Sequence, residues 1–443
     1  MTGRPTPRGM KMVARLRRAV PLILILGVSK VLALLASAVI ARYFDRETSG
    51  MVFFVTGIVT LSVSVSTLGL ASASSYYYSR NLRRRRHARN WQIFNLSLLF
   101  AVIPSIVLAL IGLLLEDARS ELAAFMVPIL AFSCFMAAVR RMSNMIFTIE
   151  NQRGWSLVHE SATYNLVIIL TIVAWSALQG GGRVGPVAGL LAVLIASALA
   201  GIFAIWHTFH KLTAGRGPFH QMRLPSLRYI SVLLAIALPS MVAQGSALIL
   251  NKIDVVMIGP LAGAIEVGNY SVAMRVTYLA GLMTEIVALF LAPKIIAIGA
   301  GGDRVKQWQI LKLATIWQVG GLLVTVIPLI LFRNQIITLI FGAEYLDVAE
   351  TYLILQIGKI TTAIFLPAIA LFTALGYNRD MAKVAVIAAV MNLALNFVLI
   401  PRFGANGAAA ATSVSLIVLF CNYVHLSLRV RRLAQIVVGD VRK

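Results

Sequence analysis

The sequence contains about 12 apolar stretches that are each long enough to cross a membrane as an α-helix. They recur along all 443 residues with short polar breaks between them, and 59% of the residues are hydrophobic while 13% are charged. A soluble domain carries about a quarter charged residues, and a membrane-spanning helix needs about 20 apolar residues in a row. The sequence therefore predicts an all-α polytopic membrane protein. The expected spans cover residues 19–41, 51–71, 93–115, 122–139, 158–178, 187–209, 229–259, 267–293, 313–332, 351–375, 384–400 and 405–428.

The positive charge of the chain predicts how these spans are oriented. Lys and Arg number 40 against 16 Asp and Glu, a net charge of +24 that in a soluble protein would favour nucleic-acid binding. Here 30 of the 40 fall in the two terminal tails and in every second loop, whereas six fall in the other loops. Because cytoplasmic loops of membrane proteins are enriched in Lys and Arg, we expect both termini in the cytoplasm and no nucleic-acid partner.

Two pairs of similar segments indicate that the chain is duplicated. Glu47-Thr-Ser-Gly50 follows the first span as Glu266-Val-Gly268 follows the seventh, and Arg183-Val-Gly185 precedes the sixth span as Arg402-Phe-Gly404 precedes the twelfth. The two pairs are offset by 218 and 219 residues. An even number of spans per repeat gives both repeats the same orientation, so we expect two parallel six-helix lobes. Their expected bounds are residues 1–226 and 227–443.

The sequence lacks the patterns of a metal, disulfide or enzyme site. Cys134 and Cys421 both lie in apolar runs, and the six histidines show no zinc motif. The loops are too short to hold a catalytic domain. We therefore expect no metal, no cofactor and no enzymatic activity.

Six ionisable residues lie inside the expected spans, where each costs about 2.5 to 3.5 kcal/mol at a helix centre. At about 100° per residue, three polar groups share helix faces. They are Arg275 with Tyr278 and Glu285; Asp254 with Gln244 and Asn251; and Lys359 with Gln356. Lys30 has only Ser37 on its face, and Lys252 falls off its stripe, near enough to the outer end to extend toward the headgroups. These stripes fit either a cavity wall or helix packing through polar groups.

Four segments resemble a known transporter family. The family is the polysaccharide transporters, the Wzx-like flippases of O-antigen and other lipid-linked oligosaccharides, in the superfamily that also contains the MATE exporters. The segments are residues 41–50; 254–259 with 266–270; 341–345; and Asn392 through Asn396 to residue 408.

The resemblance implies a MATE-like bundle in which two lobes enclose a central cavity and work by alternating access. It also implies transport of undecaprenyl-diphosphate-linked oligosaccharide across the bacterial cytoplasmic (inner) membrane, for surface polysaccharide or exopolysaccharide biosynthesis. A polysaccharide polymerase and other assembly proteins would be its partners, beside membrane lipids.

Buried cations suit such a substrate because a diphosphate is a compact anion. Our hypothesis is that Lys30, Arg275 and Lys359 hold the diphosphate. The residues expected to complete the substrate site are Gln244, Asn251, Tyr278 and Gln356.

The two acids inside the spans admit two interpretations. Asp254 and Glu285 could form cavity ion pairs, or one could bind a proton or sodium ion that drives transport.

Two other transporter functions remain open. A MATE-type antiporter of cationic drugs predicts acidic rather than basic cavity residues, and a lipid II flippase usually carries two additional helices.

Overall fold

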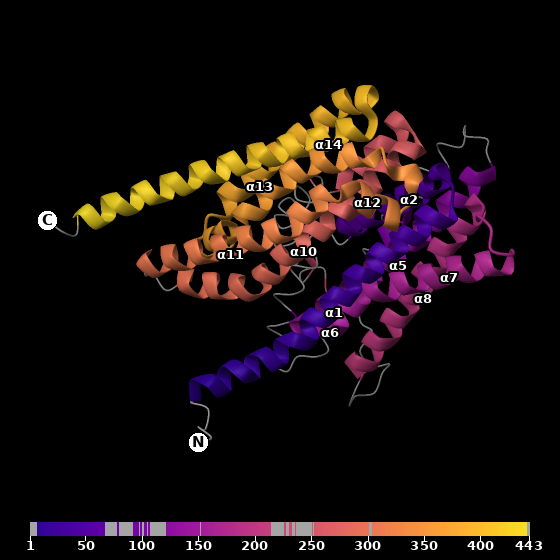
Figure 1. The fold of residues 1–443 in the computed structure, drawn as a ribbon. Helices are drawn as coiled ribbons and strands as arrows, with labels where there is room; N and C mark the ends of the chain where they lie inside the picture. Colours follow the sequence, from indigo (N-terminus) through magenta and orange to yellow (C-terminus); the bar gives the residue numbers. More distant parts are fainter. Residues whose placement is uncertain are drawn as a thin grey trace, which may run out of the picture. The chain divides into compact units, whose positions relative to one another are not determined.

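In the structure, a computed structural model, the described residues form mainly helices (Figure 1). It describes residues 7–66, 121–150, 152–213, 252–300 and 304–440, and a few residues between 78 and 106 and between 226 and 250. Every element in these ranges is a helix. Eight of them are long and apolar enough to cross a membrane. The chain is therefore a multi-pass, all-helical membrane protein, as the hydropathy pattern predicts.

The chain forms two compact units. Unit 1 consists of Met1–Asp45 and Ile58–Met241, and unit 2 of Arg46–Gly57 and Val242–Lys443. The first part of α2 (Arg46–Ser66) thus belongs to unit 2 and its second part to unit 1. The lobes expected at 1–226 and 227–443, and their relation as parallel repeats, stay predictions.

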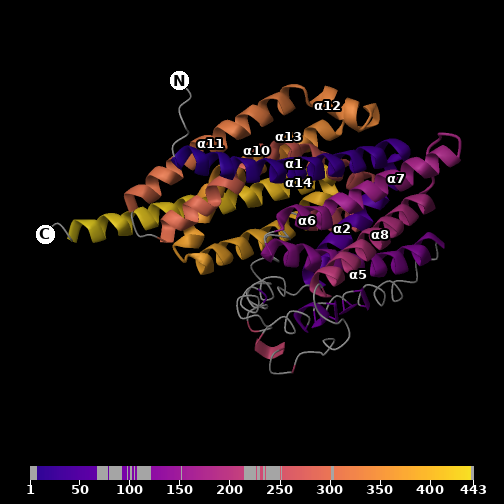
Figure 2. The same ribbon diagram turned by 90° about the horizontal axis from the view of Figure 1, so that it is seen from below.

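Unit 1 is built around α5, α7 and α8, which pack side by side (Figure 2). α8 contacts both of the others, and α1 packs against α7. The bounds are α1 Pro7–Tyr43, α5 Glu121–Ile149, α6 Arg153–Leu157, the π-helix η1 Val158–Ala162, α7 Thr163–Leu178 and α8 Pro186–Thr213.

The helix α5 corrects one predicted boundary. We expected this span to end at residue 139 and placed Arg140 and Arg141 in a cytoplasmic loop, but α5 continues to Ile149 and buries Arg140. Two adjacent arginines lower the local hydropathy, which ended the apolar stretch in sequence. The backbone continues as a helix because its N–H and C=O groups need partners inside the membrane.

Unit 2 is a bundle in which α13 lies between α10 and α14, and α10 also packs against α11 (Figure 1). The bounds are α10 Ala264–Ala300, α11 Arg304–Leu331, α12 Arg333–Ile340, the 3₁₀-helix η2 Ala343–Tyr345, α13 Val348–Ala374 and α14 Asn378–Asp440. A further helical segment covers residues 252–262.

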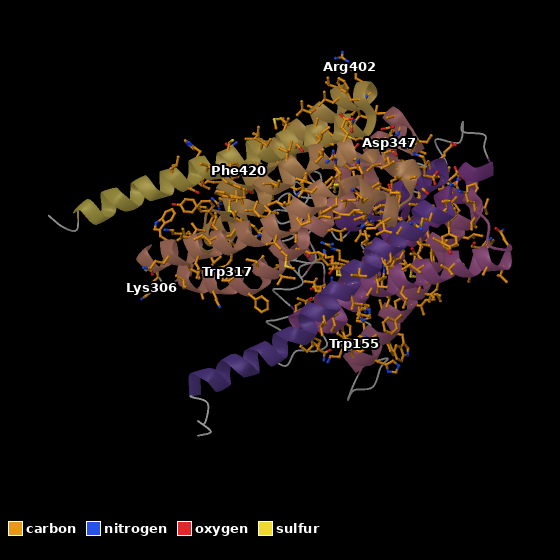
Figure 3. The ribbon with its side chains drawn as sticks, in the orientation of Figure 1. Trp155, Lys306, Trp317, Asp347, Arg402 and Phe420 are labelled. Atoms are coloured by element: carbon orange, nitrogen blue, oxygen red, sulfur yellow. The ribbon has the colours of Figure 1, made fainter. Side chains whose placement is uncertain are left out.

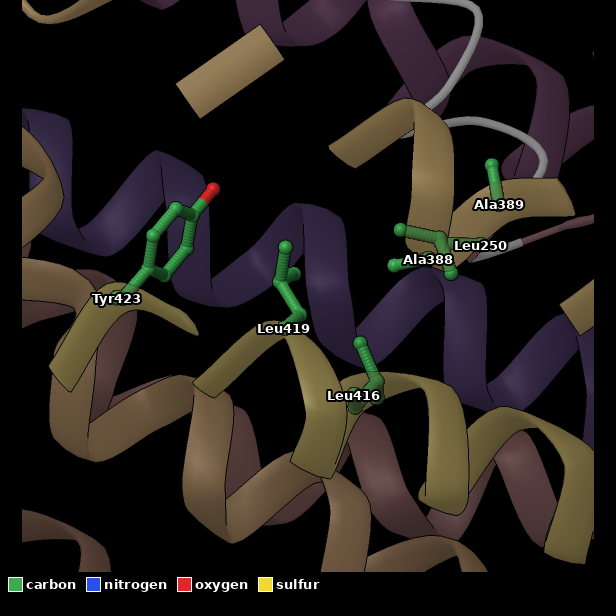
Figure 4. Packing of buried hydrophobic residues seen from close by; sticks show 6 residues of the cluster. All are labelled: Leu250, Ala388, Ala389, Leu416, Leu419 and Tyr423. Carbon is green, nitrogen blue, oxygen red and sulfur yellow. The ribbon is translucent and has the colours of Figure 1, made fainter. Parts of the chain in front are cut away.

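The long helix α14 is two helices that meet at Gly404, where φ is 53° and ψ is −130°. The chain turns back there, so that residues on both sides of the turn pack together. Figure 4 shows this apolar cluster, which consists of Leu250, Ala388, Ala389, Leu416, Leu419 and Tyr423. The two separate spans predicted at 384–400 and 405–428 are confirmed.

Polar side chains join the loops at one end of unit 2. Asp347 and Arg402 lie at this end and Lys306 lies at the opposite end (Figure 3). Arg46 donates hydrogen bonds of 2.6 Å to Asn269 and to Asp347. A Cβ atom at Gly50 would overlap the carbonyl group of Ala264, so only glycine permits this close approach of α2 to α10.

Candidate functional site

The carboxylate of Asp254 is fully buried in unit 2 and is held by neutral hydrogen-bond donors. The hydroxyls of Tyr270 and Thr412 donate hydrogen bonds to Oδ2 of Asp254, and the distance from Thr412 is 2.7 Å. The side-chain amide of Asn396 donates a hydrogen bond of 2.7 Å to Oδ1. The Asn392 amide lies 3.5 Å from Oδ1. A buried charge without such partners would cost several kcal/mol. This Asp254 cage therefore stabilises the carboxylate without neutralising its charge.

Three elements position the cage. Tyr270 comes from the first turns of α10, Asn392 and Asn396 lie one helical turn apart on the first part of α14, and Thr412 lies on the second part. Residues four apart share a helix face, so both asparagines point to the same carboxylate. The turn at Gly404 brings Thr412 beside them. Asn392 Nδ2 and Thr412 Oγ1 are 3.2 Å apart.

One atom of the cage has no hydrogen bond. The carbonyl oxygen Oδ1 of Asn396 is buried and has no partner in the described part of the chain. Buried carbonyl oxygens are nearly always paired with a donor or a cation. The Asp254 cage thus combines a carboxylate, two hydroxyls and an amide oxygen that is available to a ligand.

A basic cluster lies next to the cage. Lys252 donates a hydrogen bond of 3.3 Å to the hydroxyl of Tyr278, and its ammonium lies 5.3 Å from the centre of that ring. Lys359 interacts electrostatically with both Tyr278 and Asp254, and Arg275 with Tyr278. We call Lys252, Arg275, Tyr278 and Lys359 the basic cluster. It contains three cations beside one buried carboxylate, so it carries an excess of positive charge.

The structure thus brings several predicted site residues together and adds one. Arg275, Tyr278, Lys359 and Asp254 were expected in the site and meet in unit 2. Lys252, which we expected to extend toward the headgroups, instead contacts Tyr278.

The other predicted site residues have different surroundings. Gln356 is buried on α13, and its Oε1 has no hydrogen bond in the described region. Glu285 is exposed on α10, and Lys30 is half-buried on α1 of unit 1. Gln244 and Asn251 lie outside the described residues. The roles assigned to these residues stay predictions.

Sequence reasoning assigned no role to four of the cage residues. Tyr270, Asn392 and Asn396 lie within the segments that carry the family resemblance, but neutral polar side chains in a span resemble ordinary helix packing. Thr412 lies outside those segments. A buried acid needs donors, and that requirement was the signal that could have singled them out.

Unit 1 contains a second polar group that sequence reasoning missed. His159 of η1 and His207 of α8 are joined by a hydrogen bond of 2.9 Å and pack among Phe147, Trp155 and Phe203. No group of three or more His, Cys, Asp or Glu in the described residues could hold a metal ion.

These features define a class: a polytopic, all-helical membrane protein with charged groups buried in its bundle. A family model described as polysaccharide biosynthesis protein matches residues 16–295, and the chain belongs to this family. The family resemblance inferred from the sequence is confirmed.

Two curated proteins are similar to part of the chain. The Probable low-salt glycan biosynthesis flippase Agl15 of Haloferax volcanii is 28% identical over 269 residues, which cover 59% of this chain and 54% of that protein. The Uncharacterized membrane protein MJ1068 of Methanocaldococcus jannaschii is 23% identical, with coverage of 58% and 51%. The chain therefore matches about half the length of these relatives.

Solved structures of similar fold cover nearly the whole chain. An inward-facing multidrug resistance MATE family transporter of the MOP superfamily superimposes with a TM-score of 0.70 at 15% identity, covering 94% of this chain and 99% of its own. The lipid II flippase MurJ in an inward closed conformation gives 0.71 at 14% identity, covering 93% and 87%. At these identities the likeness shows the fold, and the predicted MATE-like fold is confirmed.

Proposed function

We propose that the protein is a transporter that flips a polyprenyl-diphosphate-linked oligosaccharide across the cytoplasmic membrane by alternating access. The basic cluster is the observation that supports this most. In it, Lys252, Arg275 and Lys359 interact electrostatically with Tyr278 inside a membrane-spanning bundle. Lys and Arg bind phosphate through charge-assisted hydrogen bonds. The similarity to a glycan biosynthesis flippase points to the same substrate class.

In this function the basic cluster holds the diphosphate while the prenyl chain stays among the membrane lipids. Gln356 and Tyr278 would contact the adjoining sugars, and Gln244 and Asn251 would complete the substrate site in unit 2. Lys30 of unit 1 is a further candidate cation for the diphosphate. Undecaprenyl as the prenyl carrier, a bacterial inner membrane, and a polymerase as partner are parts of the same proposal.

The Asp254 cage would bind the driving ion, a proton or Na⁺. A carboxylate in a membrane span is a frequent proton or ion site in transporters. The buried, unpaired Oδ1 of Asn396 supports an oxygen-ligated cation, since it lies on a side chain that already contacts Asp254. Glu285 is the second candidate for this role.

Complementation tests the function. The gene is expressed in strains that each lack one flippase for a known polyprenyl-diphosphate glycan, including a strain depleted of its lipid II flippase, and surface glycan is measured. We expect export to fall by about tenfold or more in Arg275→Gln and Lys359→Gln, since a hydrogen bond to a charged group contributes about 1.5 to 3 kcal/mol. Lys294→Gln removes the same charge from an exposed position of α10 and is the matched control.

Two outcomes would contradict the proposal. Normal export in Arg275→Gln, Lys359→Gln and Lys30→Gln, at wild-type protein level, would show that these cations do not hold the substrate. Restored efflux of cationic drugs without export of any glycan would favour a MATE-type antiporter.

A further inference from the structure

Arg140 is a buried cation to which the proposed function assigns no role. It lies on α5 within the spanning segment Val127–Ile149, and its side chain is 8% exposed. About 13 Å of helix separates it from the end of α5 at Ile149. The residue is therefore inside the bundle of unit 1.

The guanidinium of Arg140 stacks on a ring, and its Nε has no hydrogen bond. It lies 4.6 Å from the ring centre of Tyr164 on α7. Its Nε is buried and has no hydrogen-bond partner in the described part of the chain. A cation stacked on an aromatic face keeps the N–H groups in its plane available for an acceptor.

Two acidic side chains in the described part of unit 1 do not supply a counter-charge. Glu150 is bound by the hydroxyl of Tyr78 at 2.8 Å and by Lys211 at 3.0 Å, and Glu160 is exposed. Glu121 begins α5, about 28 Å of helix before Arg140. The complete set in unit 1 is Asp45, Glu116, Asp117, Glu121, Glu150 and Glu160.

The face of α5 that carries Arg140 also carries one hydroxyl, that of Ser133. Ser133, Arg140 and Phe147 are spaced by seven residues and therefore lie on one face of the helix. The Oγ of Ser133 is buried without a hydrogen bond, as is that of Ser197 on α8, which packs against α5. Arg140 thus shares a helix face with a buried hydroxyl that has no hydrogen bond in the described part of the chain.

A buried cation without a partner is strongly unfavourable, and one ring contact does not offset this cost. An anion with several acceptor oxygens would satisfy the guanidinium, and inside a membrane such a group reaches the protein on a lipid. Phosphate matches the planar fork of donors. We propose that Arg140, with Tyr164 stacked on it, forms a binding site for a lipid-borne phosphate in unit 1.

This site is distinct from the basic cluster of unit 2 and does not depend on glycan export, because it would bind any lipid with an accessible phosphate. Two sources share this chemistry, the polyprenyl diphosphate of a substrate and the headgroup of an anionic phospholipid.

Binding to the purified full-length chain tests the site. It is measured by the shift in thermal unfolding midpoint in the background Arg275→Gln/Lys359→Gln, so that the basic cluster does not dominate the signal. The probes are undecaprenyl diphosphate, phosphatidylglycerol and, as a lipid without phosphate, diacylglycerol. We expect undecaprenyl diphosphate, phosphatidylglycerol or both to raise the thermal unfolding midpoint until the site is saturated. Diacylglycerol should have no effect.

Arg140→Gln should weaken this binding by about tenfold to a hundredfold, because charge-assisted hydrogen bonds are lost. Arg141→Gln removes the same charge from the neighbouring, half-exposed position and should leave binding unchanged. Arg140→Lys keeps the positive charge but lacks the planar set of N–H donors, so it should give an intermediate affinity. This variant also tests the site if Arg140→Gln does not fold.

Arg140→Met separates a binding role from a structural one. Without lipid phosphate we expect its unfolding midpoint to equal or exceed that of the parent, because an uncompensated buried charge is removed. A lower midpoint without ligand, or equal binding of both phosphate lipids by Arg140→Gln and its parent, would overturn the proposal. If Arg140→Gln weakens the binding of undecaprenyl diphosphate alone, the ligand is the proposed substrate. If it weakens the binding of phosphatidylglycerol equally, the ligand is a membrane lipid.

Discussion

At the scale of single residues, the charged groups of unit 2 have two kinds of surroundings. The Asp254 carboxyl group receives hydrogen bonds from neutral donors, which supply no counter-charge. Lys252 instead donates a hydrogen bond to Tyr278, and Lys359 interacts electrostatically with both Tyr278 and Asp254. A carboxylate next to cations can link the binding of a driving ion to that of an anionic substrate, because each charge changes the free energy of the other.

Asp254→Asn should abolish the dependence of transport on the driving ion. The substitution keeps the size of the side chain but removes the charge that a proton or Na⁺ would neutralise. Glycan export is measured in vesicles with an imposed pH gradient or Na⁺ gradient, and Asp380→Asn, at an exposed position of α14, is the control. Gradient dependence that persists in the double variant Asp254→Asn/Glu285→Gln would exclude both acids as the ion site.

At the scale of helices, the break in α14 determines where the Asp254 cage can form. Glu266 accepts the N–H of Ala405 at 2.7 Å, at the first turn of the second part of α14. That position favours a negative charge because the first N–H groups of a helix lack internal partners. Gly404 is required because a Cβ atom there would collide with the Glu266 carboxylate, and because its φ of 53° is unfavourable for other residues.

Gly404→Ala should therefore destabilise the protein by about 1 to 3 kcal/mol, the range for a residue forced into a strained backbone conformation. Thermal unfolding of the purified protein measures the effect. Gly320→Ala is the matched control, because Gly320 lies inside α11 with no atom within 4 Å of the new methyl group. We expect this control to be neutral or slightly stabilising, since alanine is the better helix former. An unfolding midpoint equal to that of the parent in Gly404→Ala would contradict the strain argument.

At the scale of the whole molecule, the distribution of basic residues predicts the orientation in the membrane. Within unit 2, Asp347 and Arg402 lie at one end and Lys306 at the other (Figure 3). This separation agrees with the alternate loops to which the sequence assigns them. The excess of Lys and Arg in the loop set that contains Lys306 predicts that this end faces the cytoplasm.

Cysteine labelling in intact cells tests this orientation. In a background with Cys134→Ala and Cys421→Ser, a membrane-impermeant maleimide should label Gly182→Cys, in the exposed turn between α7 and α8. It should label Lys306→Cys, at the start of α11, only after the membrane is permeabilised. The opposite labelling pattern would place the termini outside the cytoplasm.

The sequence predicted the helical class, most spans and part of the candidate site because these depend on local properties. Arg275 and Lys359 could be singled out because a charge inside an apolar stretch is visible in the sequence, and Tyr278 because it shares a helix face with Arg275. Lys252 could not, since its distance to Tyr278 depends on how the segment 252–262 packs against α10.

Hydropathy and the positions of Lys and Arg determined by themselves that this chain is a multi-pass membrane protein, because an apolar stretch of spanning length has few alternatives to a membrane helix. Only the tertiary structure decided which groups meet each buried charge. The partners of Asp254 come from positions up to 158 residues away. Arg140, which the sequence predicts to lie in a loop, is buried on α5. Such partners depend on helix packing in three dimensions, which the order of residues along the chain does not display.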